Sequence, residues 1–278
     1  YRGLADRKLR HVGVRHEQGA GFMADGYARA SGKPAACCLI TGPGLLNAAT
    51  PIGQAYSDSV PMLVLASVNA SDDLGKGRGR LHEITDQHAA IAPLTGLTRT
   101  IRSAAELPEA MAAAFQMFET GRPRPAVLNL TLDMLRAPAD LPPQQRRHHP
   151  RPQASAADLA AAAKLIDAAQ RPLAIFGGGC VDCAAEARAF VDKSGVIAVT
   201  TTAGRGVIAD SHPATLRATL QQAATQAALA EADLVIAVGT ELGETDSWTG
   251  FLTFTGKLIR IDLDAHTLTR DYAPAIDD

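Results

Sequence analysis

The sequence lacks an excess of either charge, a long apolar run and a cysteine-rich pattern. Lys and Arg number 27 and Asp and Glu number 29 in 278 residues, so the chain offers no electrostatic field for nucleic acid or an anionic membrane. No apolar run approaches the roughly 20 residues that a membrane-spanning helix needs. We therefore expect no nucleic-acid partner, no membrane partner and a cytoplasmic location.

The four cysteines form two pairs that are close in sequence. Cys37 and Cys38 lie inside an apolar run, residues 35–40, where a free cysteine packs as a small hydrophobic residue. Cys180 and Cys183 have the spacing of a redox pair or of half a zinc site. A zinc site needs a second ligand pair at matching spacing, and none appears. We expect reduced thiols and no metal ligands in this chain.

Strand-like and helix-like runs alternate along the chain, which predicts βαβ units and parallel sheets. The first half predicts strands at 11–15, 35–40, 62–67 and 126–130, and helices at 18–30, 45–58 and 106–120. The second half predicts a helix at 156–169 and strands at 173–176, 196–200, 234–238 and 258–261, with helices between them.

Residues 137–153 interrupt this alternation with five prolines and clustered charges, which predicts an exposed linker. Hydrophobic residues make up 46% of the chain, enough for more than one core. The predicted fold class is therefore α/β, with two parallel-sheet domains at 1–137 and 154–278 and a linker at 138–153.

One acidic residue, Glu17, lies between the predicted strand 11–15 and the predicted helix 18–30. Ligands of open α/β sheets bind outside the carboxyl ends of the strands, so this acid is well placed to contact a cofactor. Acids are also common in the first turn of a helix, where they complement the helix dipole, and both interpretations stay open.

Several glycine loops follow predicted strands. Gly42, Pro43 and Gly44 come directly after the strand 35–40, and the free N–H groups of the next helix could hold a phosphate, although tight turning explains the glycines equally well. Gly177–Gly179 lacks the complete G-x-G-x-x-G pattern, so a nicotinamide site is not expected there.

Residues 75–88, GKGRGRLHEITDQH, form a loop-like run with three glycines, three cations and two histidines. Such a loop can move and can contact an anion, or it can simply be a solvated surface loop.

Three longer segments of the sequence resemble those of a known family: RHEQGAGFMADGYARASGKP, ITGPGLLNAATPIGQAYSDSVPMLVLASVN and IRIDLDAH. They are similar to thiamine-diphosphate enzymes of the acetolactate synthase and 2-oxo acid decarboxylase superfamily, and nearly the whole chain takes part. GKGRGRLHEITDQ and DSWTGF resemble the corresponding segments of the 5-guanidino-2-oxopentanoate decarboxylase type.

The resemblance implies a pyrimidine-binding domain followed by a Rossmann-like central domain, in a homodimer or homotetramer with active sites at the dimer interface. In relatives the central domain can hold FAD, which nothing in this sequence indicates. The implied roles are catalysis and cofactor binding for Glu17, cofactor binding for Gly42, Pro43, Gly44 and Asn47, proton transfer or substrate polarisation for His82, and the substrate pocket for His82 and Glu83.

The implied chemistry begins with a carboxyl group hydrogen-bonded to the aminopyrimidine of thiamine diphosphate, which favours the ylid. The ylid adds to a 2-oxo acid, carbon dioxide departs and an enamine remains. Protonation of the enamine releases an aldehyde, whereas attack on a second carbonyl gives a carboligase such as acetolactate synthase. The sequence does not separate these two outcomes.

The chain departs from the family pattern in two places. No Gly-Asp-Gly occurs, although relatives use this motif in a third domain to hold Mg2+ and the diphosphate. The first strand, helix and glycine-rich loop expected before Tyr1 are also absent from this sequence. We therefore expect an inactive fragment of a longer enzyme, which an intact mass well above 29.0 kDa for the natural protein would support. Two alternatives stay open: a non-catalytic relative with the same fold, and a dinucleotide-binding oxidoreductase.

Overall fold

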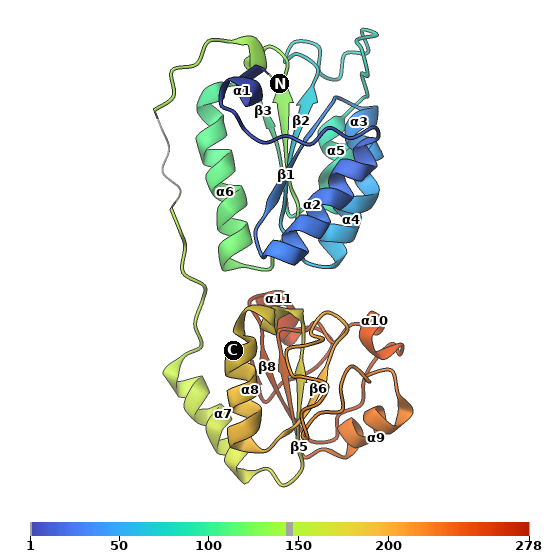
Figure 1. Ribbon diagram of the computed structural model, residues 1–278, viewed down its shortest axis with the longest axis vertical. Coiled ribbons are helices and arrows are strands. Elements are labelled where there is room, and N and C mark those ends of the chain that lie inside the picture. The colour runs from blue at the N-terminus through green and yellow to red at the C-terminus, as the bar shows by residue number, and fades with distance from the viewer. Residues whose placement is uncertain (1, 143–146, 278) are drawn as a thin grey trace. The chain divides into compact units, whose positions relative to one another are not determined.

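The computed structural model describes residues 2–142 and 147–277, which divide into two compact units (Figure 1). Unit 1 comprises Tyr1–Arg151 and unit 2 comprises Pro152–Asp278. Each unit has one fully parallel sheet between helices, which confirms the predicted α/β class. Among the described residues, no helix combines the length and the apolar character needed to cross a bilayer.

The sheet of unit 1 has the strand order β1-β2-β4-β3. Its strands are β1 Ala35–Leu39, β2 Met62–Val68, β3 Leu97–Ile101 and β4 Ala126–Thr131. The α-helices are α1 Arg2–Asp6, α2 Glu17–Ser31, α3 Pro43–Asn47, α4 Ala49–Ser57, α5 Gln87–Ile91 and α6 Leu107–Thr120. Three 3-10 helices complete the unit: η1 Ala92–Leu94, η2 Ala104–Glu106 and η3 Met134–Arg136.

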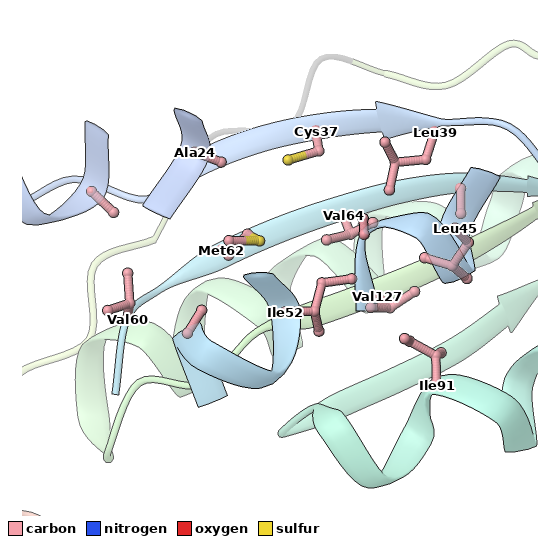
Figure 2. Close-up of a cluster of buried hydrophobic side chains, with 14 residues drawn as sticks. Ala24, Cys37, Leu39, Leu45, Ile52, Val60, Met62, Val64, Ile91 and Val127 are labelled. Atoms are coloured by element: carbon pink, nitrogen blue, oxygen red, sulfur yellow. The ribbon is translucent and has the colours of Figure 1, made fainter. Parts of the chain in front are cut away.

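Helices cover both faces of this sheet, so its central strands are apolar on both sides (Figure 1). Helix α6 packs on one face, and α2, α4 and α5 pack on the other. Figure 2 shows the second of these cores, where Ile52 of α4 and Met62 and Val64 of the sheet are fully buried. Each such side chain contributes about 1.5–3 kcal/mol through burial.

The sheet of unit 2 has the order β6-β5-β7-β8-β9. Its strands are β5 Pro172–Phe176, β6 Ile197–Thr200, β7 Leu234–Val238, β8 Lys257–Ile261 and β9 Ile276–Asp277. Its helices are α7 Ala156–Ala168, η4 Gly178–Cys183, α8 Ala184–Ser194, α9 Ala223–Glu231, α10 Glu244–Ser247 and α11 Ala265–Thr269. This arrangement is the doubly wound type that binds ligands at the carboxyl ends of its strands.

The predicted strand 11–15 is wrong. This segment runs extended without pairing to any described strand, and Val12 and Val14 are exposed. The alternation of apolar and polar residues in this segment is typical of a half-buried strand, but the segment pairs with no strand of the sheet. The predicted helix 45–58 is interrupted at Ala48, where ψ is 2° and α3 gives way to α4.

Two strands were not predicted, β3 and β9. The predicted linker, residues 138–153, contains neither helix nor strand in its described part, and its residues 143–146 lie outside the described residues. The division between the two units falls inside this segment, between Arg151 and Pro152.

Candidate active site at the carboxyl edge of the first sheet

Glu17 is the first residue of α2 and is half-buried. Its helix begins at the N-cap His16, whose ring Nδ1 accepts a hydrogen bond from the backbone N–H of Gln18 at 3.2 Å. This cap satisfies one of the free donors at the helix end. The predicted helix therefore exists with Glu17 at its N-terminus, although the segment before it is not a strand.

The carboxylate of Glu17 is held by the neighbouring helix α3. The side-chain amide of Asn47, the last residue of α3, donates to Oε2 of Glu17 at 3.0 Å. This bond, then the backbone N–H of Glu17, and the nearby His16 and His82 lower the pKa of the carboxyl group. The carboxylate is consequently ionised and fixed in direction, ready to accept a hydrogen bond from a ligand.

The glycine loop lies directly beside this carboxylate. A Cβ atom added to Gly44 would sit 3.4 Å from Oε1 of Glu17 and only 2.2 Å from the side chain of Ile40. A Cβ atom added to Gly42 would lie 2.1 Å from the carbonyl oxygen of His82. Gly42 also has a φ of +57°, which glycine adopts without strain. Glycine is required at both positions because neighbouring atoms leave no room for a side chain, whether or not a phosphate binds.

Gln87 holds the glycine loop in place, a role that no sequence pattern predicted. Oε1 of this buried side chain accepts the backbone N–H of Gly42 at 2.7 Å. Its Nε2 donates to the carbonyl oxygen of Ser67 at 3.0 Å and to Oδ1 of Asn129 at 2.8 Å. One carboxamide thus connects the glycine loop to β2 and β4, and the polar Asn129 within a buried strand was the available signal for it.

His82 reaches the same edge through its backbone. It is exposed and has a φ of +55°, a left-handed conformation that is uncommon for a non-glycine residue. Its carbonyl oxygen faces Gly42, and its ring contributes to lowering the pKa of Glu17. The structure therefore brings His82, Glu17, Asn47 and the glycine loop together, and the catalytic role of His82 stays a prediction.

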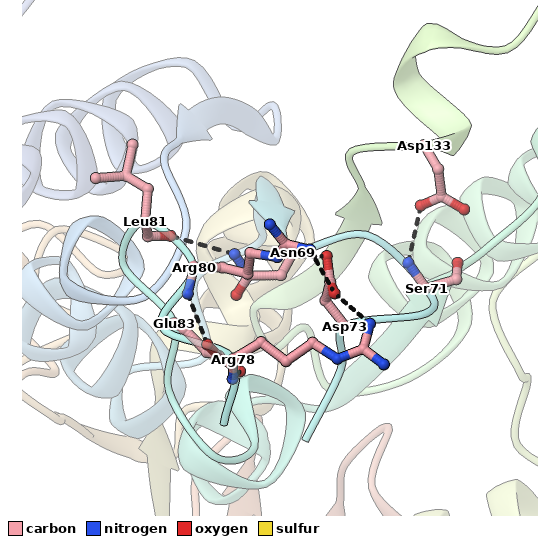
Figure 3. A network of polar contacts seen from close by, with 8 residues as sticks. All are labelled: Asn69, Ser71, Asp73, Arg78, Arg80, Leu81, Glu83 and Asp133. Carbon is pink, nitrogen blue, oxygen red and sulfur yellow. Dashed lines mark hydrogen bonds and ion pairs between the residues drawn. The ribbon is translucent and has the colours of Figure 1, made fainter. Parts of the chain in front are cut away.

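Glu83, in contrast, is used inside its own loop (Figure 3). Its two carboxylate oxygens accept the backbone N–H groups of Arg78 at 3.1 Å and Arg80 at 2.8 Å. These bonds, the Arg80 bond first, lower the pKa of Glu83. The carboxylate organises the turn that presents His82, and its contact with a substrate stays a prediction.

Asp73 binds the two arginines of this loop (Figure 3). The guanidinium groups of Arg78 and Arg80 each lie 3.0 Å from its carboxylate, and their hydrogen bonds lower the pKa of Asp73. The main chain of the loop is further tied to β2 because Asn69 donates to the carbonyl oxygen of Leu81 at 3.2 Å. The loop 75–88 is therefore an internally bonded structure, and two of its three cations have carboxylate partners.

In unit 2 the glycine loops are explained by backbone contact. A Cβ atom added to Gly177 would lie 2.1 Å from the carbonyl oxygen of Gly239, and one added to Gly204 would lie 2.2 Å from that of Phe176. Over residues 2–142 and 147–277, no three His, Cys, Asp or Glu side chains are placed to hold a metal ion. Cys180 is buried and Cys183 is exposed, and both are free thiols.

Two units with parallel sheets define the α/β class, whose members bind ligands at the carboxyl edges of their sheets, and in the first unit a fixed carboxylate lies beside a glycine loop at this edge. Residues 1–90 match the family model "Thiamine pyrophosphate enzyme, N-terminal TPP binding domain", and residues 159–277 match "Thiamine pyrophosphate enzyme, central domain". The chain belongs to the thiamine pyrophosphate enzyme family, which confirms the resemblance seen in the sequence.

Individual relatives carry enzyme names. The Pseudomonas aeruginosa protein named "Probable 2-ketoarginine decarboxylase AruI" is 46% identical over 278 residues, covering 99% of this chain and 50% of that protein. Acetolactate synthase isozyme 1 large subunit of Escherichia coli is 30% identical, covering 97% and 48%. The acetolactate synthase large subunit of Corynebacterium glutamicum is 35% identical, covering 92% and 42%. The chain spans about half the length of the curated relatives it matches.

Proposed function

We propose that this chain acts in a thiamine-diphosphate-dependent enzyme that decarboxylates a 2-oxo acid, with residues 1–137 as its pyrimidine-binding domain and 154–278 as its central domain. The observation that carries the proposal is the ionised carboxylate of Glu17, fixed by Asn47 beside a glycine loop. Family membership supports the same cofactor. When bound, thiamine diphosphate supplies the carbon nucleophile and the electron sink for decarboxylation.

The residues present fit the pyrimidine end of this cofactor. Oε2 of Glu17 is engaged by Asn47, and Oε1, on the Gly44 side, would bond a ring nitrogen and hold its proton. Gly44 has no side chain to obstruct this oxygen. Gly42, Pro43 and Gly44 would form the wall of the site, and Gln87 keeps that wall in position by binding the N–H of Gly42.

The decisive experiment is Glu17→Gln in the natural protein at its full length, established by intact mass. Glutamine has almost the same shape and can still bond Asn47, so we expect normal folding and retained cofactor binding. We expect exchange of the cofactor C2 proton to slow by roughly 100-fold or more, because a positioned acid–base group has been removed. Glu106→Gln, at an exposed acid on η2, is the matched control. Unchanged exchange in Glu17→Gln would reject the assigned role.

The substrate that we propose is 5-guanidino-2-oxopentanoate, the compound also called 2-ketoarginine. The 46% identical relative named for this compound favours it over pyruvate. His82 is proposed to polarise the substrate or to transfer a proton, with Glu83 orienting the loop that carries it. Assays of both 2-oxo acids with product identification test this choice. Preference for pyruvate with acetolactate formation would instead favour the carboligase reaction.

The remaining features are proposed from the family alone. The enzyme would use Mg2+ at ligands outside this chain and would work as a cytoplasmic homo-oligomer, a dimer or tetramer, with its site at a subunit interface. We do not propose that the central domain binds FAD. Metal depletion followed by Mg2+ addition tests the need for the metal. Sedimentation of the natural protein tests its oligomeric state.

A further inference from the structure

A cavity of about 200 Å³ opens at the carboxyl edge of the first sheet. Its walls include Asn69 after β2, Thr100 and Arg102 at the end of β3, and Asp86 and His88 at the start of α5, together with part of the loop that precedes α5. Gln87 also lines it, between the cavity and the glycine loop whose N–H it binds. Carboxyl edges of parallel sheets are where α/β proteins bind ligands, and this cavity is lined mainly by polar groups.

Two exposed residues of opposite charge, Arg102 and Asp86, line this cavity and form no ion pair with each other. Among the described residues, Arg102 has no hydrogen bond and no ion pair. Asp86 accepts the N–H of Ala89 on Oδ1 at 2.9 Å, and its Oδ2 has no partner within the same described part of the chain. An arginine and a carboxylate on one small cavity commonly pair directly, since each bidentate bond is favourable. Here they are held apart on separate elements.

Three arginines near this cavity or on its strand are paired. Arg78 and Arg80 bind Asp73, and Arg99, also on β3, binds Glu109 at 2.8 Å. Arg102 differs from these three in having no such partner among the described residues, and it lines the cavity. A ligand that bridges Arg102 and Asp86 would need an anion at one end and a cation at the other.

We propose that this cavity binds a small zwitterion, an amino acid or a guanidino acid, with its carboxylate on Arg102 and its cationic group on Asp86. Asn69 and Thr100 also line the cavity and provide neutral hydrogen-bonding groups. The site does not depend on the proposed function. It would, however, be separated from the glycine loop by a single side chain, that of Gln87, so an occupant could be either an effector or the charged end of the substrate.

Calorimetric titration of the 278-residue chain with 4-aminobutyrate, butyrate and butylamine tests the charge requirement. We expect 4-aminobutyrate to bind with a Kd of about 1 mM or tighter and at least roughly tenfold better than either singly charged probe. Arg102→Gln and Asp86→Asn should each weaken this binding roughly tenfold. Asparagine still caps α5, so the second variant should keep its fold. Arg99→Gln, on the same strand, is the matched control and should bind normally.

No binding of 4-aminobutyrate, equal binding of all three probes, or normal binding by both cavity variants would overturn the proposal. Steady-state assays of Arg102→Gln in the natural enzyme then separate the two sources of ligand. A raised KM for 5-guanidino-2-oxopentanoate, together with lost probe binding, identifies the substrate. An unchanged KM with lost probe binding identifies a separate effector.

Discussion

The two units build the carboxyl edges of their sheets from different parts of the chain. In unit 1 side chains make the decisive contacts: Asn47 holds Glu17, and Gln87 holds the backbone of Gly42. In unit 2 backbone packs on backbone, with Gly177 against the carbonyl of Gly239. Substitutions of these residues should therefore act differently, through lost hydrogen bonds at Asn47 and Gln87 and through steric overlap at Gly177.

The buried cation of unit 2 also acts on the main chain, although through its side chain. Arg260, with 1% of its surface exposed, donates to the backbone carbonyl oxygens of Arg270 at 3.0 Å and Thr240 at 3.4 Å. Burial lowers its pKa. Its guanidinium thus secures main-chain loops at the edge. In unit 1 polar side chains lie at the glycine loop and line a cavity, and the proposed chemistry of this chain is located there.

The largest effect on stability is expected from Gly239→Ala. The new Cβ would lie 2.8 Å from the Cα of Gly179, and the residue has a φ of +59°. Overpacking and left-handed strain together should cost roughly 4 kcal/mol of unfolding free energy. Denaturant unfolding with a probe in each unit should show the loss in unit 2.

Gly195→Ala is the matched control for that prediction. Gly195 has a φ of +70°, but no atom lies within 4 Å of an added Cβ. Only the strain remains, so the expected cost is about 1–2 kcal/mol. Equal losses in the two variants would show that backbone conformation matters here and that the close contact between glycine loops does not.

Gln87→Leu should have the next largest effect, in unit 1. Leucine fills a similar space but leaves the buried N–H of Gly42 and the carbonyl of Ser67 without their partner. We expect a loss of about 2–3 kcal/mol in unfolding free energy. The control is Gln54→Leu, at an exposed glutamine bonded to Asp58, which should change it by about 0.5 kcal/mol or less. Equal changes in both variants would contradict the bridging role of Gln87.

Much of the fold was predictable because buried parallel strands are continuous apolar runs, as β2 and β7 are. β3 was missed because its sequence, LTRTI, alternates apolar and polar residues at an edge of the sheet. The segment 11–15 carried the same kind of alternation and formed no strand, since pairing depends on the neighbours that the tertiary fold supplies. Local sequence could not distinguish these two cases.

The candidate site was only partly predictable for the same reason. Glu17 and the Gly42–Gly44 loop stood out through their positions beside predicted elements. Gln87 looked like one more polar residue of a loop, and its burial depends on a partner 45 residues away. The pairing of Arg78 and Arg80 with Asp73 likewise depends on how the loop folds and could not be predicted from the sequence.

A smaller effect is expected at low pH from Asp133, another side chain that fixes the edge of unit 1. The backbone N–H of Ser71, at 3.0 Å, lowers the pKa of this carboxyl from 3.8 to about 2 (Figure 3). Because the folded pKa is depressed, the stabilisation is complete above the ordinary value and disappears as the pH falls toward 2. Asp133→Asn should remove this part of the acid dependence of unfolding. Asp140→Asn should retain it, and identical pH profiles for Asp133→Asn and the unchanged protein would contradict the assignment.

The smallest effect is expected from Glu83, whose carboxylate holds only its own exposed loop. Glu83→Ala should speed amide hydrogen exchange of Arg78 and Arg80 roughly tenfold, because each amide loses one charge-assisted bond, while the free energy of global unfolding stays the same. Glu83→Gln keeps an acceptor and should change the rates less. In unit 2 the N–H of Gly204, bonded to the hydroxyl of Thr201 at 3.0 Å, serves as the internal reference. Faster exchange at Gly204 as well would mean that the two edges are coupled, contrary to their separate construction.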